Sequence, residues 1–148
     1  MMKTVAAIAC AIALLAPLSA SAGEVVGPAR TPSCRYRYLD DRVQFSAWEV
    51  QRTIRCAVHR WDVPGGVGLA LCIAERESHF AWFADNPTSS ASGVYQFVAG
   101  TWAGATSHYS RFMRWQEIGR SVWNARSNVL IAIRIAHDSG WGPWGGGC

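Results

Sequence analysis

The residue best suited to chemistry in this sequence is Glu77, a carboxylic acid at the end of an apolar segment. On a helical wheel, Ala70, Ile73 and Ala74 fall on the same side as Glu77, whereas Glu75 falls almost opposite. A carboxylic acid among apolar groups is costly to ionise, and an acid that still holds its proton near neutral pH can act as a general acid. The pattern therefore predicts that Glu77 donates a proton to a leaving-group oxygen.

A polar loop follows this acid. Residues 85–93 (Asp-Asn-Pro-Thr-Ser-Ser-Ala-Ser-Gly) have the composition of turns, which predicts either a long loop or a small irregular hairpin. Asp85 is the only acid in the loop, and the next acid along the chain is Glu117. A mechanism with a single acid is therefore favoured. A turn or capping role is preferred for Asp85, and a role as second carboxylate is the alternative.

Apolar spacing and capping signals predict that helices hold this acid in place. Ser46 and Glu49 form a capping box in front of a helical stripe, and residues 64–66 (Pro-Gly-Gly) end it. A second helix, apolar nearly all round, is predicted from about Val67 to Ser78, as in a buried central element. Further helices are predicted from after Phe97 through Trp102, from Tyr109 to Ile118, and from about Val129 to Gly140.

The first 22 residues have the features of a secretory signal peptide. Lys3 precedes an almost wholly apolar stretch from Thr4 to Leu18, and residues 20–22 (Ala-Ser-Ala) fit a signal-peptidase site. A retained N-terminal anchor is the alternative. After cleavage we expect an extended arm at 23–42 and a single domain at 43–148, because the remaining chain is long enough for one core.

Four cysteines follow the predicted leader, and an even number in a secreted chain predicts two disulfides. Their spacing leaves all three pairings open. No two of these cysteines are close in sequence and no His pair has ligand spacing, so neither a metal site nor a cofactor is expected. The four are Cys34, Cys56, Cys72 and Cys148.

Charge and aromatic content limit the classes of partner. The formal net charge is +4, but the arginines form no long run, so nucleic-acid binding is not expected. A modest positive charge suits anionic cell-surface polymers, and it is equally the charge of an ordinary solvated surface. Eight tryptophans are many for this length. Such rings often line sugar-binding clefts, although core packing is the commoner role for any one of them.

Four short segments, taken in order from Cys72 to the end of the sequence, resemble the lysozyme-like lytic transglycosylases and the related resuscitation-promoting-factor domains. Each segment alone is weakly informative, whereas four in this order behind a signal peptide are fairly specific. The segments are Glu77-Ser78, Gly93-Val94-Tyr95-Gln96-Phe97, Thr101-Trp102, and Gly140-Trp141-Gly142-Pro143-Trp144 with Cys148.

The resemblance implies a small, mainly α domain of the α+β lysozyme-like fold, disulfide-stapled, with a short irregular or β segment. It implies that Glu77 is the catalytic acid and that Tyr95 and Gln96 border the sugar cleft. Ser78 is a further candidate, either orienting Glu77 or capping the helix, and Tyr109 is a candidate subsite residue. The implied reaction cleaves the β-1,4 bond between N-acetylmuramic acid and N-acetylglucosamine, with closure of a 1,6-anhydro ring and no cofactor.

The chain departs from the family pattern just before the acid. In the resuscitation-factor branch, a cysteine directly precedes the catalytic Glu and pairs with one after the closing Gly-Trp segment. Arg76 occupies that position here, and Cys72 lies one helical turn earlier on nearly the same face. The resemblance therefore implies a Cys72–Cys148 bridge, which leaves Cys34 to pair with Cys56.

A second departure follows the acid. The Glu-Ser-Gly that is common in the family is Glu77-Ser78-His79 here. A residue larger than glycine at His79 is expected to narrow the approach to the loop.

Several functions are compatible with these features of the sequence. Beside the transglycosylase stand a lysozyme-type hydrolase, a chitin-active enzyme, a cell-wall binding or signalling module with little turnover, and a small secreted interaction protein. For the preferred reading the partners are peptidoglycan glycan strands, with no nucleic acid and no membrane after signal cleavage. We expect a monomer that is secreted to the extracellular space, the periplasm or the cell wall.

Overall fold

The computed structural model describes Cys34 and residues 44–109 and 121–148. These belong to one unit, Pro32–Cys148. The predicted signal peptide, the arm at 23–42 apart from Cys34, and the predicted helix beyond Tyr109 lie outside the described residues. The elements are α1 (Ala47–Arg60), α2 (Gly66–Ser78), α3 (Ala99–Tyr109), α4 (Ala125–Ser139) and the short 3₁₀ helix η2 (Gly142–Trp144).

The capping box predicted for α1 is present. The Ser46 hydroxyl accepts a hydrogen bond from the backbone N–H of Glu49, whose carboxylate in turn accepts one from the Ser46 backbone at 2.7 Å. The backbone and side-chain hydrogen bonds from Ser46 hold the pKa of Glu49 below its usual range. The helix buries one apolar stripe, which comprises Val50, Ile54, Ala57 and Val58 together with Cys56.

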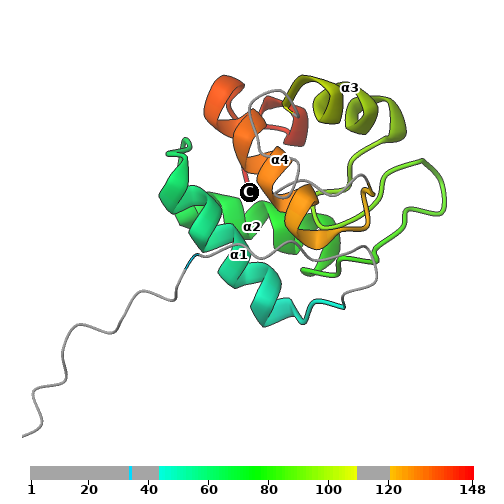
Figure 1. The fold of residues 1–148 in the computed structure, drawn as a ribbon, viewed down its shortest axis with the longest axis horizontal. Coiled ribbons are helices and arrows are strands. Elements are labelled where there is room, and N and C mark those ends of the chain that lie inside the picture. Colours follow the sequence, from blue (N-terminus) through cyan, green and yellow to red (C-terminus); the bar gives the residue numbers. More distant parts are fainter. Residues whose placement is uncertain (1–33, 35–43, 110–120) are drawn as a thin grey trace, which may run out of the picture. The chain divides into compact units, whose positions relative to one another are not determined.

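The last helix, α4, is the centre of the fold. It packs against α1 and α3, while α1 also packs against α2 (Figure 1). Asn124 caps its first turn by accepting from the N–H of Ser127, and Gly140 ends it with a φ of 75°. Almost every residue between Ala125 and Ala136 is buried, which explains its apolar sequence.

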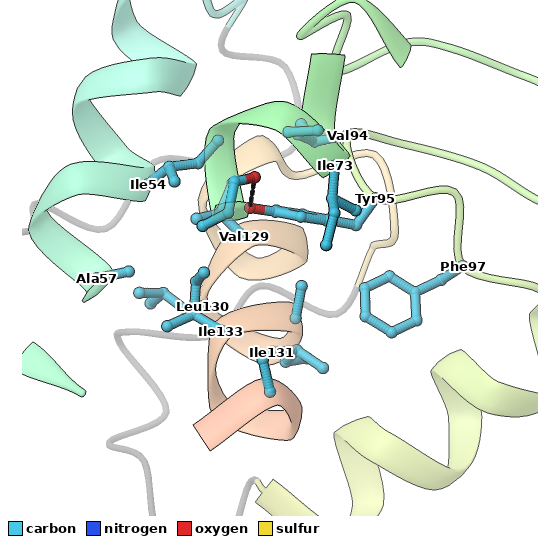
Figure 2. Close-up of a cluster of buried hydrophobic side chains, with 14 of the residues drawn as sticks. Ile54, Ala57, Ile73, Val94, Tyr95, Phe97, Val129, Leu130, Ile131 and Ile133 are labelled. Carbon is cyan, nitrogen blue, oxygen red and sulfur yellow. Dashed lines mark hydrogen bonds between the residues drawn. The ribbon is translucent and has the colours of Figure 1, made fainter. Parts of the chain in front are cut away.

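The apolar face that the helical wheel predicts for α2 is buried in the structure. Ala70, Ile73 and Ala74 are fully buried, and Figure 2 shows Ile73 pointing into a cluster with side chains of α1 and α4. Tyr95 belongs to the same cluster, and its hydroxyl donates to the carbonyl of Ala70 at 2.9 Å, the dashed line in Figure 2. Burial raises the pKa of the Tyr95 phenol.

The segment between α2 and α3 is an irregular turn rather than a regular hairpin. Two antiparallel bridges, Asp85 with Ser92 and Ser92 with Phe97, are all the β structure in the described part of the chain. Gly93 lies at the centre of this segment with a φ of 78°. The loop predicted from turn residues is thus confirmed, with a trace of β pairing at its base.

Both disulfides implied by the family resemblance are present. Cys34 pairs with Cys56 and Cys72 pairs with Cys148, with Cα atoms 5.4 and 6.0 Å apart. Such bonds are typical of proteins that fold in an oxidising compartment. Across the described ranges, no helix has the length and apolarity that crossing a bilayer requires.

We predict that Gly93→Ala destabilises the fold by roughly 3 kcal/mol, because the position combines positive φ with close packing. An added Cβ would lie 2.6 Å from the carbonyl oxygen of Val122 and would also meet the Asn128 amide. Urea unfolding measures the loss. Gly100→Ala is the matched control, since nothing lies within 4 Å of a Cβ there. Equal stability of the two variants would contradict the prediction.

A second prediction concerns alkaline pH. Below pH about 10 the Tyr95 phenol is neutral in both the folded and unfolded chain, so its contribution to stability is complete. Above that pH the unfolded chain loses the proton while the buried phenol keeps it, so stability falls as pH rises. Tyr95→Phe should make this decline shallower by about 1.4 kcal/mol per pH unit. Urea titrations between pH 8 and 11.5 measure it, and an unchanged slope would contradict it.

Candidate functional site

Glu77 lies in the last turn of α2, where helix gives way to loop. Its side chain is 24% exposed, against 52% for Glu75 two residues earlier. Glu75 instead faces solvent and contacts the His79 ring at 3.1 Å. The order of burial of the two acids is the one that the wheel predicts, and it leaves Glu77 within reach of a ligand.

The immediate contact of the Glu77 carboxylate differs from the apolar one expected. Its Oε1 accepts hydrogen bonds from Nε and Nη2 of Arg76, at 3.1 and 2.7 Å. The wheel places the two Cβ atoms on different faces, but an arginine side chain is long enough to fold back across its neighbour. The acid is therefore flanked by apolar residues of its own helix and by a guanidinium.

Arg76 also ties α2 to the C-terminal tail, residues 140–148. Its Nη1 donates to the carbonyl of Gly147 and its Nη2 to the carbonyl of Trp144, both at 2.7 Å. The Cys72–Cys148 disulfide joins the same two segments one helical turn away. A covalent and a hydrogen-bonded attachment thus hold the tail beside Glu77.

Ser78 connects the acid to the next segment of the family pattern. Its buried hydroxyl lies 2.8 Å from the carbonyl of Val94 and 3.2 Å from that of Ala74. These bonds fix the helix end against the 93–97 segment, and they engage the hydroxyl with two backbone carbonyls rather than with the Glu77 carboxylate. In this structure Ser78 therefore positions the backbone of the site rather than facing a ligand.

Tyr95 and Gln96, proposed to border a cleft, have different surroundings. The Tyr95 side chain has no exposed surface, so it supports the site from within the core. Gln96 is half-buried, and its amide donates to the carbonyls of Ala84 and Gly93. Of the two, Gln96 is the one whose position allows contact with a ligand.

Three non-glycine residues have positive φ, two directly after α2 and one in the 93–97 segment. His79 and Phe80 have φ values of 50° and 61°, and Gln96 has 49°. Among the described residues these are the only non-glycine ones in this region of the Ramachandran plot. Backbone strain of this kind persists where surrounding structure enforces it, and it often clusters at functional sites. His79 adopts a left-handed conformation that glycine reaches without a Cβ penalty.

The aromatic residues of the family pattern form one cluster. Phe97 contacts Trp102 and Trp144, with ring centroids 5.3 and 5.6 Å apart, and Tyr95 stacks on Trp141 at 5.9 Å. The Trp144 indole donates to the carbonyl of Tyr95 at 2.8 Å. These rings serve as core and bring together the segments at 93–97, 101–102 and 140–144.

Two other candidates lie in different surroundings. Tyr109 is buried at the end of α3, where burial, followed by a hydrogen bond with Asp138 of α4, raises the pKa of its phenol. Asp85 accepts a hydrogen bond from the Ser92 hydroxyl at 3.1 Å, which is the loop role preferred for it. Neither residue has a contact with Glu77 among the interactions of the described chain.

Sequence reasoning missed two residues that build the site. Asn128 is fully buried, accepts from the Tyr95 backbone N–H, and donates to the carbonyls of Ser92 and Val122. The available signal was an amide directly before the apolar run that starts at Val129. The second is Arg76, whose signal was its place in the position of a family cysteine.

No group of three or more His, Cys, Asp and Glu side chains suitable for a metal ion occurs in the described ranges. A scan of the sequence against protein-family models gives no match, and a search of curated proteins finds no similar sequence.

We predict that His79→Gly stabilises the fold by about 0.5–1 kcal/mol, because glycine adopts the left-handed conformation without a Cβ penalty. His79→Ala is the matched control, since it removes the same imidazole contact with Glu75 but retains the strained backbone. Thermal unfolding of both variants separates the two effects. The explanation fails if glycine and alanine lower stability equally.

Proposed function

We propose that this protein is a secreted, lysozyme-like lytic transglycosylase that cleaves the β-1,4 bond between N-acetylmuramic acid and N-acetylglucosamine in peptidoglycan. Glu77 is its general acid and base. The two disulfides favour the proposed location outside the cytoplasm, since they are stable in an oxidising environment.

The observation that carries the proposal is that the four separated motif segments are linked to one another by successive contacts that begin at the end of α2. The Ser78 hydroxyl joins Glu77-Ser78 to the 93–97 segment, and the Phe97 ring joins that segment to Trp102 and Trp144. Arg76 then links the closing segment to Glu77, because its guanidinium donates both to the carbonyl of Trp144 and to the Glu77 carboxylate. Segments that act together in a family should meet in space, and these do.

The proposed reaction needs one carboxyl group used twice. Protonated Glu77 gives its proton to the glycosidic oxygen while the C1–O bond breaks and positive charge develops at the sugar ring. The resulting carboxylate then accepts the proton of the sugar's own 6-hydroxyl as O6 bonds to C1. The 1,6-anhydro ring closes, the acid is regenerated and no water is consumed. Gln96, half-buried beside the loop, is the candidate for contact with the glycan.

A transglycosylase is preferred over a hydrolase because Asp85 is engaged in the loop. Its carboxylate accepts a hydrogen bond from the Ser92 hydroxyl, and its backbone pairs with that of Ser92 in an isolated β-bridge. A hydrolase would need a second carboxylate or an activated water opposite the acid. A carboxylate that maintains the loop is poorly suited to that role.

The test is mass spectrometry of the products released from purified peptidoglycan by the oxidised chain, with chitin assayed in parallel. We predict anhydro-ended muropeptides from the parent and at least a 100-fold lower yield from Glu77→Gln, which cannot donate the proton. Glu75→Gln is the matched control on the same helix, and it should retain the parent's activity because Glu75 faces solvent.

Other outcomes select other functions. Reducing-end muropeptides would indicate a hydrolase and make Asp85→Asn the next variant. Products from chitin and none from peptidoglycan would indicate that chitin is the substrate. Peptidoglycan binding without products, unaffected by Glu77→Gln, would indicate a wall-binding module, and neither binding nor products would favour a secreted interaction protein.

A further inference from the structure

We infer that Arg76 is a positioning residue for Glu77: it fixes one carboxylate oxygen, leaves the other to carry the catalytic proton, and is itself held in place by the C-terminal tail. This inference rests on the proposed function, because it concerns the atom from which the proton is delivered. It assigns a role to a residue that stands where the related family has a cysteine.

The two oxygens of Glu77 have different surroundings. Oε1 accepts both guanidinium hydrogen bonds, at 3.1 Å from Nε and 2.7 Å from Nη2, whereas Oε2 accepts none from the described residues. Bonds from a charged donor occupy the lone pairs of Oε1 and disfavour a proton there. Oε2 is therefore the oxygen open to exchange a proton with a bound glycan. A carboxyl anchored through one oxygen also has less freedom to rotate away from a bound glycan.

The guanidinium is oriented by more than its contact with Glu77. Four hydrogen bonds involve its nitrogens, two to Oε1 and one each to the carbonyls of Trp144 and Gly147. Arginine presents its five N–H groups in a rigid planar fork, so fixing two of them on the tail fixes the direction of the others. Lysine has a single nitrogen on a flexible stem and cannot satisfy both sides in the same way.

The tail has anchors that do not depend on Arg76. Cys148 is bonded to Cys72, the Trp144 indole donates to the carbonyl of Tyr95, and the Trp141 indole donates to that of Pro64 at 2.9 Å. Removing the guanidinium should therefore leave the tail attached and the fold intact. A loss of activity can then be attributed to the orientation of Glu77.

The experiment compares kcat and KM of Arg76→Gln and Arg76→Lys with those of the parent on isolated peptidoglycan. We expect kcat to fall about 10- to 100-fold in both variants, because a displaced catalytic group loses reactive geometry. KM should stay within about twofold, since the glycan is bound by other residues. Arg55→Gln, an exposed arginine on α1, is the matched control and should behave as the parent.

The two variants separate geometry from charge. Full activity of Arg76→Lys would show that charge alone matters and would overturn the positioning role. A parallel change of kcat, KM and melting temperature would also overturn it, since that pattern indicates a structural residue. If the parent is active and Arg76→Gln equals it, only this inference fails. If the parent and Arg55→Gln release no muropeptides, the proposed function fails as well.

A double-mutant cycle tests the link to the tail. Replacing Cys72 and Cys148 together by serine should lower kcat by loosening the carbonyls that orient Arg76. In the Arg76→Gln background the same replacement should have little further effect, because the group through which the tail acts is gone. Additive losses, with both chains folded by circular dichroism, would contradict the link.

Discussion

The site depends on the buried side-chain amide of Asn128. One amide accepts the Tyr95 backbone N–H at 2.8 Å and donates to two carbonyls, those of Ser92 at 3.3 Å and Val122 at 3.0 Å. Each bond is worth only about 1 kcal/mol net, but an unpaired backbone group in the same place would cost about 1–3 kcal/mol. An irregular loop can enter the core only when its polar groups are satisfied in this way.

Further contacts follow from this constraint. With residues 92–95 held on α4, the Tyr95 ring reaches α2 and the carbonyl of Val94 faces Ser78. Gly93 passes too close to the amide for any side chain. The end of α2 is thereby fixed, and Glu77 acquires its position at the boundary between helix and loop. Rigid support of this kind is what a group that transfers protons requires.

Much of the fold could be predicted because its signals are local. The capping box at Ser46 and the glycine at 140 define helix ends within a few residues of the chain, and the wheel gives the relative burial of Glu75 and Glu77. The pairing of Cys72 with Cys148 followed from the family resemblance, since spacing alone left it open.

The surroundings of the site could not be predicted because they depend on distant contacts. Arg76 turns toward Glu77 while bonded to carbonyls 68 and 71 residues away, and local periodicity contains nothing about either. Tyr95 lies in a segment expected to border a cleft, yet the direction of its side chain is set by Asn128 on α4. Motif position locates a segment without saying which of its side chains turn inward.

The link between Cys72 and Cys148 also acts before the protein folds. It closes a loop of 76 residues. The loss of conformational entropy raises the free energy of the unfolded chain by about 4.5 kcal/mol at 25 °C. That loop contains α3, α4 and the 85–97 turn, and the turn bonds to α2 through Ser78 and through the carbonyl of Ala70. Once the bond exists, the tail meets Arg76 at the high effective concentration of a tethered partner. In the oxidised unfolded chain, the segments that form the site therefore sample a far smaller volume relative to one another than in the reduced chain.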